Sequence, residues 1–161
     1  MRYLKDSESK QVIKDFVAQY SSSVDYLKSV KHIQALKVED TEVFFVAGNP
    51  WILRTKSRLF PSLKFYAVLS ALPRVIIDMG AIPYVANGAP IMRPGIRQIE
   101  GDFKKDDLIA IQDEKYRKVI ALGIAETDSE IMRSMTKGRV IENIHYVGDE
   151  LWNSFTITKQ P

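Results

Sequence analysis

The stretch that decides the fold is residues 75–96, which read VIIDMGAIPYVANGAPIMRPGI. Its apolar start predicts a strand, and Gly80 lets the backbone leave that strand sharply. A short helix is expected next, because Asn87-Gly88 suits a helix end that needs positive φ. Pro94-Gly95 has the residue chemistry of a type II turn. The stretch therefore predicts strand, tight turn, short helix, tight turn and strand.

These turns also have a functional interpretation. Backbone exposed at glycine turns can approach a phosphate closely, and Arg93 and Arg97 flank the last turn. The alternative interpretation is that the glycines only turn corners. The residues alone leave both interpretations open.

Outward from this stretch, the chain is expected to divide near Leu72 and Pro73. The part before this point predicts three elements: a capped amphipathic helix that begins at residues 7–9, a hairpin over residues 42–53, and a second helix that residues 60–63 open and Pro73 ends. We therefore expect one domain over residues 1–72 and another over residues 73–161.

The part after this point predicts short strands separated by glycines. The expected strands are residues 74–77, 108–112, 118–125 and 139–145, with a hairpin turn at residues 113–116. Asp128 and Ser129 are candidate caps of a short helix that Gly138 ends. This pattern is typical of a small barrel.

Composition and motifs exclude several classes of function. The 161 residues contain no cysteine and two histidines, so disulfides, thiolate metal sites and cysteine nucleophiles are excluded. The eight glycines form neither a phosphate-binding loop nor a dinucleotide-binding motif, and no serine hydrolase or zinc protease motif occurs. We expect no cofactor, no metal and no catalytic residue. Without an expected transmembrane helix or signal peptide, a cytoplasmic location is the default expectation.

Charge is uneven along the chain. Residues 1–72 hold eleven Lys or Arg against seven Asp or Glu, whereas residues 73–161 hold twelve against thirteen. Residues 43–77 contain no acid, and their aromatic side chains are interleaved with Arg54, Lys56, Arg58 and Lys64. Such a segment can hold phosphates or stack on bases. The alternative is that the aromatic residues form the core and the cations are solvated.

Several motifs together resemble one known domain. They are Asp78-Met79-Gly80-Ala81, Asn87-Gly88-Ala89, Arg93-Pro94-Gly95-Ile96 and the closing segment from Gly138 to Trp152. In this order they resemble the PUA domain, an RNA-binding module named after pseudouridine synthases and archaeosine transglycosylases. The whole chain is similar to the malignant T-cell amplified sequence family, its ligatin relatives and archaeal proteins in which a pre-PUA domain precedes the PUA domain.

The resemblance implies a fold class and a function. The fold would be α+β, with an N-terminal α/β pre-PUA domain followed by a small mixed β-barrel with short helices. The function would be non-enzymatic RNA binding, through contacts with ribosomal RNA of the small subunit or with tRNA in translation initiation or recycling. A separate translation-factor protein would be its partner.

The resemblance also implies where RNA would bind. The RNA-facing surface would contain Met79, Gly80, Ala81, Asn87, Gly88, Arg93, Pro94, Gly95, Ile96 and Arg97. The closing strand would add Lys137, Gly138 and Arg139, and the basic segment would add Arg54, Lys56, Arg58 and Lys64.

Two other hypotheses remain open at this point. The near-neutral second half also fits a protein–protein interaction module without direct RNA contact. An enzyme acting on RNA would need a base or nucleophile such as Asp78 or His145 in a pocket, and no motif supports it.

Overall fold

The computed structural model describes residues 1–20, 25–56 and 58–156, and these residues form two compact units. The first unit comprises Met1–Ala71 together with residues 153–156, and the second comprises Leu72–Trp152. The two units divide near residue 72, and residues 153–156 lie with the first unit. The limits 1–72 and 73–161 therefore remain a proposal about domains.

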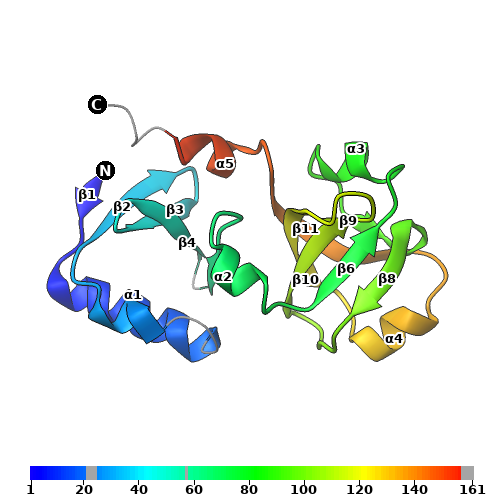
Figure 1. The fold of residues 1–161 in the computed structure, drawn as a ribbon, viewed down its shortest axis with the longest axis horizontal. Coiled ribbons are helices and arrows are strands. Elements are labelled where there is room, and N and C mark those ends of the chain that lie inside the picture. The colour runs from blue at the N-terminus through cyan, green and yellow to red at the C-terminus, as the bar shows by residue number, and fades with distance from the viewer. Residues whose placement is uncertain (21–24, 57, 157–161) are drawn as a thin grey trace. The chain divides into compact units, whose positions relative to one another are not determined.

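The first unit is one antiparallel sheet covered on one face by a helix (Figure 1). Its elements are β1 (Arg2–Tyr3), α1 (Asp6–Gln19), the 3-10 turn η2 (Asp25–Ser29), β2 (Ile33–Val38), β3 (Thr41–Val46), β4 (Asn49–Thr55), β5 (Arg58–Pro61) and α2 (Tyr66–Leu69). The five strands lie in the sheet in sequence order. The predicted hairpin is thus β3 and β4.

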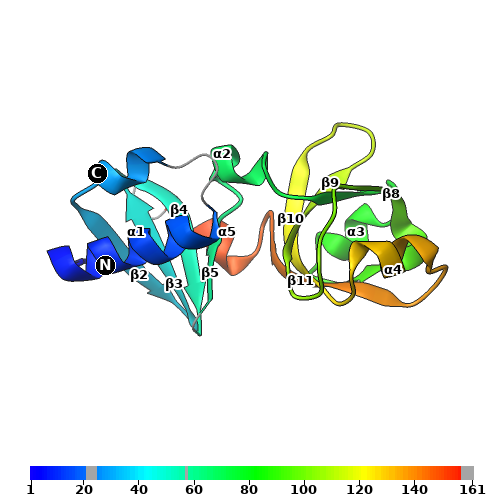
Figure 2. The same cartoon turned by 90° about the horizontal axis from the view of Figure 1, so that it is seen from below.

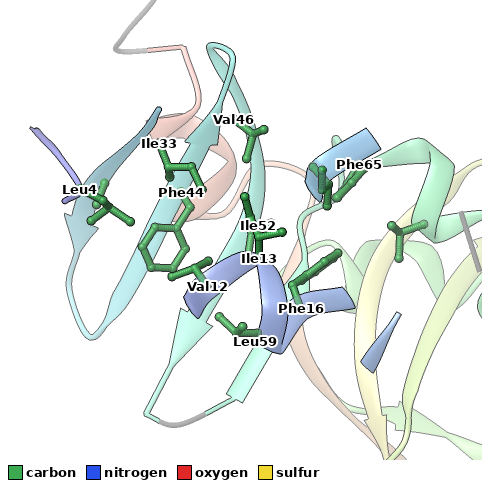
Figure 3. Close-up of a cluster of buried hydrophobic side chains, with 13 residues drawn as sticks. Leu4, Val12, Ile13, Phe16, Ile33, Phe44, Val46, Ile52, Leu59 and Phe65 are labelled. Carbon is green, nitrogen blue, oxygen red and sulfur yellow. The ribbon is translucent and has the colours of Figure 1, made fainter. Parts of the chain in front are cut away.

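The core of this unit lies between α1 and the sheet (Figure 3). Val12, Ile13 and Phe16 from α1 pack with Phe44 of β3 and Ile52 of β4, all of them buried. The buried residues of α1 recur at helical spacing, and those of β3 in this core, Phe44 and Val46, are two residues apart. Each of these elements therefore turns one face toward this core.

The second predicted helix is much shorter than expected. Arg58–Pro61 forms strand β5, and only Tyr66–Leu69 is helical. The reason is that Leu59 and Phe60 pair with β4, and both side chains are buried there. The start of the segment that is expected to open a helix therefore forms an edge strand of the sheet.

The second unit is a curled, mixed six-stranded sheet with short helices (Figure 2). Its elements are β6 (Arg74–Ile77), α3 (Ile82–Val85), β7 (Ile91–Met92), the 3-10 turn η3 (Arg93–Gly95), β8 (Ile96–Glu100), β9 (Leu108–Asp113), β10 (Val119–Ala125), α4 (Ser129–Ser134) and β11 (Arg139–Tyr146). A last helix, α5 (Glu150–Ser154), crosses the division between the units. The strand order is β7-β11-β10-β9-β6-β8, and β6 runs parallel to β9. The expected α+β class with a mixed small-barrel sheet is confirmed.

The predicted caps of α4 act differently from the expectation. Asp128 occupies the N-cap position but makes no capping bond, and its Oδ1 accepts the N–H of Lys105 at 2.8 Å. The Ser129 hydroxyl accepts the N–H of Phe103 at 3.0 Å. Both side chains thus fasten the helix to the loop before β9.

Strands β10 and β11 approach each other unusually closely at Gly123. This residue is buried opposite Asn143, next to a shift in strand register. A Cβ added to Gly123 would lie 2.3 Å from Cγ2 of Ile141 and 2.7 Å from the carbonyl oxygen of Glu142. Only glycine fits this position without displacing β11.

We predict that Gly123→Ala lowers the free energy of unfolding by about 1–3 kcal/mol, because the methyl group overpacks the sheet. Urea denaturation followed by circular dichroism measures the change. Lys118→Ala, at an exposed position, is the control and should change stability by less than about 0.5 kcal/mol. Equal stability of Gly123→Ala and wild type would contradict the close approach.

The hairpin between β9 and β10 depends on a buried carboxylate. Asp113 accepts the backbone N–H groups of Tyr116 and Lys118, the latter at 3.1 Å. Burial raises the pKa of Asp113, but these hydrogen bonds to the charged form outweigh it, so the pKa lies below its ordinary value. The ionised carboxylate therefore stabilises the folded unit above the pKa of the unfolded chain.

We predict that Asp113→Asn destabilises the protein by roughly 1–3 kcal/mol at neutral pH, the usual cost of losing hydrogen bonds to a charged group. The wild-type advantage should shrink as pH falls below about 4, the ordinary pKa of Asp, and through the lower pKa of the folded state. Urea denaturation of both proteins between pH 7 and pH 2.5 tests this. A difference that stays constant over this range would contradict the role of the charge.

Candidate nucleic-acid interface

A pocket of about 500 Å³ opens at the surface of the second unit. Eleven residues line it: Asp78, Gly80, Ala81, Tyr84, Val85, Ala89, Pro90, Ile91, Met92, Pro94 and Gly95. All of them come from residues 75–96, so the two turns and the short helix of that stretch fold into one concave site. Its size is within the range of small-ligand pockets.

The two turns of the stretch are tied to each other. The N–H of Asp78 donates to the carbonyl of Gly95 at 2.9 Å, and Asp78 Oδ1 accepts the N–H of Ala81 at 2.9 Å. A Cβ on Gly95 would lie 3.3 Å from the Cβ of Ala81. The expected type II turn at Pro94-Gly95 is wrong, because Arg93–Gly95 forms a 3-10 turn and Gly95 does not have positive φ. Glycine serves close approach here rather than turn geometry.

The far wall of the pocket is held by β11. The side-chain amide of Asn143 donates to the carbonyls of Val85 at 3.0 Å and Ala89 at 3.1 Å. Gly88 lies between them with φ of +90°, and a Cβ there would lie 3.1 Å from the Tyr146 ring. The predicted positive φ at the end of the short helix is therefore confirmed at Gly88. One strand thus fixes the loop that closes the pocket.

Large apolar side chains are exposed around this pocket. Tyr84 is 70% exposed, Met92 47% and Met79 37%. In α3 it is Val85 that is buried, so the neighbouring Tyr84 points to solvent. The hydroxyl of Tyr84 makes no hydrogen bond within the described part of the chain. An exposed tyrosine at the mouth of an apolar pocket is a stacking surface for a planar ligand.

Sequence reasoning placed four of the lining residues in the site, namely Gly80, Ala81, Pro94 and Gly95. Asp78, Tyr84 and Met92 also line the pocket but are not among the predicted RNA-facing residues. The available signal was the helix itself, because a four-residue helix that buries Val85 must expose the residue beside it.

Arg93 has a different environment from the one expected of a phosphate contact. Its Nε donates to the carbonyl of Met132 at 2.8 Å and its Nη1 donates to the carbonyl of Ile96 at 3.2 Å. Ile96 itself is buried in the core. Arg93 thus joins η3 to α4, and its removal would disturb the fold as well as any RNA contact.

The structure brings the closing strand next to this site. The N–H of Arg93 donates to the carbonyl of Gly138 at 2.8 Å, and Arg139 pairs with Met92 across β11 and β7. Arg139 forms an ion pair with Glu126 at 2.6 Å, and Arg97 forms one with Glu114 at 3.5 Å. Such surface pairs contribute only about 0–1 kcal/mol, so phosphates can replace either carboxylate. Lys137 is also exposed, whereas Asn87 is exposed and donates to the carbonyl of Pro83.

The basic residues of the first unit form a separate set. Arg54 donates twice to Glu42, at 2.8 and 3.1 Å, and lies over the Phe44 ring. Lys56 is exposed and lines a surface hollow with Arg54, whereas Arg58 and Lys64 are half-buried outside it. The carboxylates of Asp15 and Glu42 line the same hollow. Although residues 43–77 contain no acid, the carboxylates of α1 and β3 therefore lie close to the cations of this segment.

The described residues form neither a metal-ligand cluster nor a membrane-spanning helix. Within residues 1–20, 25–56 and 58–156, no three His, Asp or Glu side chains gather as metal ligands would. No helix in these ranges is long and apolar enough to cross a membrane.

Comparison with known proteins identifies the second unit. The family model described as PUA domain matches residues 73–147, which include every residue of the pocket. The second unit is thus a PUA domain.

Relatives extend over almost the whole chain. Translation machinery-associated protein 20 of Saccharomyces cerevisiae is 31% identical over 93% of this chain and 90% of its own length. An uncharacterized protein of Methanocaldococcus jannaschii is 30% identical over 94% of each chain. The crystal structure of a hypothetical protein from Pyrococcus horikoshii superimposes with a TM-score of 0.79 at 25% identity, covering 96% of this chain and 98% of that one. The chain belongs to the family of PUA-domain proteins that includes translation machinery-associated protein 20 and the malignant T-cell-amplified sequence proteins.

We predict that Asn143→Ala loosens the pocket wall, because the carbonyls of Val85 and Ala89 lose their shared donor. Amide hydrogen exchange of residues 86–89 should become at least tenfold faster, which corresponds to roughly 1.4 kcal/mol, the energy of one to two hydrogen bonds. Exchange in β9, which makes no contact with the Asn143 amide, is the internal control. Unchanged protection of residues 86–89 would contradict the role of Asn143.

Proposed function

We propose that this protein is a non-enzymatic RNA-binding protein of the translation apparatus. The PUA domain and the relative named translation machinery-associated protein 20 support an RNA-binding role in translation. The finer part of the proposal is that the protein contacts ribosomal RNA of the small subunit or tRNA during initiation or recycling, in the cytoplasm, with a separate translation-factor partner.

One observation supports the pocket as the RNA-binding site. The pocket formed by residues 78–95 combines an apolar interior with an exposed tyrosine at its mouth. Proteins that hold single-stranded nucleic acid combine aromatic stacking surfaces with neighbouring cations in this way. Arg97, Lys137 and Arg139 supply exposed cations on the elements that flank the pocket. In this proposal RNA is bound with bases at the pocket and phosphates at the flanking cations.

The two residues named as candidate bases differ in position: Asp78 lines the pocket, whereas His145 does not. His145 is fully buried, and its Nδ1 lies 2.8 Å from Oδ2 of Asp149. Asp149 also accepts the N–H groups of Tyr146 and Trp152. Burial raises the pKa of Asp149. The hydrogen bond and the charge of His145 lower it by more, so the pKa lies below its ordinary value. This pair is a structural link at the end of β11, in which His145 is buried and Asp149 is half-buried.

We predict that Tyr84→Ala weakens binding to single-stranded RNA by about tenfold to a hundredfold, since one base stacked on an aromatic ring contributes roughly 1–3 kcal/mol. Tyr84→Phe should bind as wild type does, because the ring is kept and the hydroxyl has no partner among the described residues. Fluorescence anisotropy with a labelled RNA hexamer measures both.

The exposed ring of Tyr66 in α2 offers a matched control, since Tyr66→Ala removes a tyrosine of similar exposure from the first unit. Equal RNA affinity of Tyr84→Ala and wild type would contradict the site. The absence of RNA binding by the wild type at low salt would contradict the function and favour the protein–protein interaction module.

A further inference from the structure

The pocket of the PUA domain has an unusual charge for a site expected to bind RNA. Its eleven lining residues include no Lys, Arg or His, and Asp78 is the one charged side chain among them. The guanidinium of Arg93, the cation beside it in sequence, is held by two backbone carbonyls. A phosphate placed in the pocket would meet a carboxylate without a compensating cation, which is unfavourable in an apolar cavity.

The carboxylate of Asp78 has one oxygen to offer. Its Oδ1 accepts the N–H of Ala81, while its Oδ2 makes no hydrogen bond to any residue that the structure describes. Asp78 therefore brings one negatively charged acceptor to the pocket, and none of the other lining residues carries a charge. A matching ligand is planar and apolar on its faces and carries an N–H donor at its edge.

The unpaired nucleobases differ in this respect. Adenine, cytosine and guanine carry an exocyclic amino group, which donates hydrogen bonds. Uracil has only a ring N–H between two carbonyl oxygens, and those oxygens repel a carboxylate. Acceptance by Asp78 thus separates amino-bearing bases from uracil.

We propose that the pocket binds one unpaired nucleobase that carries an exocyclic amino group, with the amino group donating to Oδ2 of Asp78 and the ring lying against Tyr84 and Met92. This inference rests on the proposed function, and it adds which chemical feature of the RNA is read. Phosphates of the same strand lie outside the pocket, at Arg97, Lys137 and Arg139.

The first test changes the ligand and leaves the protein intact. Hexamers of adenosine and of purine riboside, which lacks only the amino group, are compared by fluorescence anisotropy with wild-type protein. The adenosine hexamer should bind at least fivefold more tightly. Equal affinity of the two would overturn the proposal, and so would an abasic hexamer that binds as tightly as adenosine.

The second test exchanges the acceptor for a donor. Asp78→Asn keeps an oxygen for the N–H of Ala81 and places an amide NH2 where Oδ2 was, so it should favour the carbonyl oxygens of uracil. The preference of the wild type for adenosine over uridine hexamers should shrink at least fivefold or reverse in this variant. Glu130→Gln, an exposed carboxylate on α4 outside the pocket, is the matched control and should keep the wild-type preference.

Failure of this inference can be told from failure of the proposed function. If all hexamers bind equally and Tyr84→Ala weakens each of them, the protein binds RNA at this site but Asp78 does not read the base. If the wild type binds no hexamer, the proposed function itself fails. If Asp78→Asn is unfolded by circular dichroism, the comparison of adenosine with purine riboside decides.

Discussion

The architecture of the second unit depends on the close approach of β10 and β11 at Gly123. No side chain separates the two strands there, because a Cβ would collide with Ile141 and with the carbonyl of Glu142. Asn143 stands opposite Gly123 in the ladder. Since β11 pairs with β10 on one edge and with β7 on the other, its position decides where the Asn143 amide points. That amide holds the loop that completes the pocket.

The chemistry of the pocket depends on which neighbouring arginines are bound to other groups of the protein. Arg93 is bound to backbone carbonyls, whereas Arg97 and Arg139 hold only surface ion pairs that phosphates can replace. The interior is left apolar, with the Asp78 carboxylate as its charged group. In the proposed function this division places bases inside the pocket and phosphates outside it. The proposed base contact would carry specificity, while contacts to the RNA backbone would contribute salt-dependent affinity.

Much of this could be predicted from the sequence where local rules decide. The strands at β6, β9, β10 and β11 follow from their β-rich runs, and Gly88 follows from a helix end that needs positive φ. Long-range pairing decided the rest. Leu59 and Phe60 form a strand because β4 lies beside them, and the half-buried Arg93 is hydrogen-bonded to backbone because the carbonyl of Met132 is within reach. Both partners are distant in the sequence. The local sequence therefore predicted a helix at residues 60–63 and a phosphate contact at Arg93.

The central claim is that single-stranded RNA binds through the pocket built by residues 78–95. Nuclear magnetic resonance of uniformly 15N-labelled protein, titrated with an unlabelled adenosine hexamer, tests it most directly. The account predicts that the largest amide shifts fall on Gly80, Ala81, Tyr84, Met92 and Gly95, with smaller shifts at the flanking cations. Shifts confined to the basic residues of the first unit, or no shifts at saturating RNA, would contradict it.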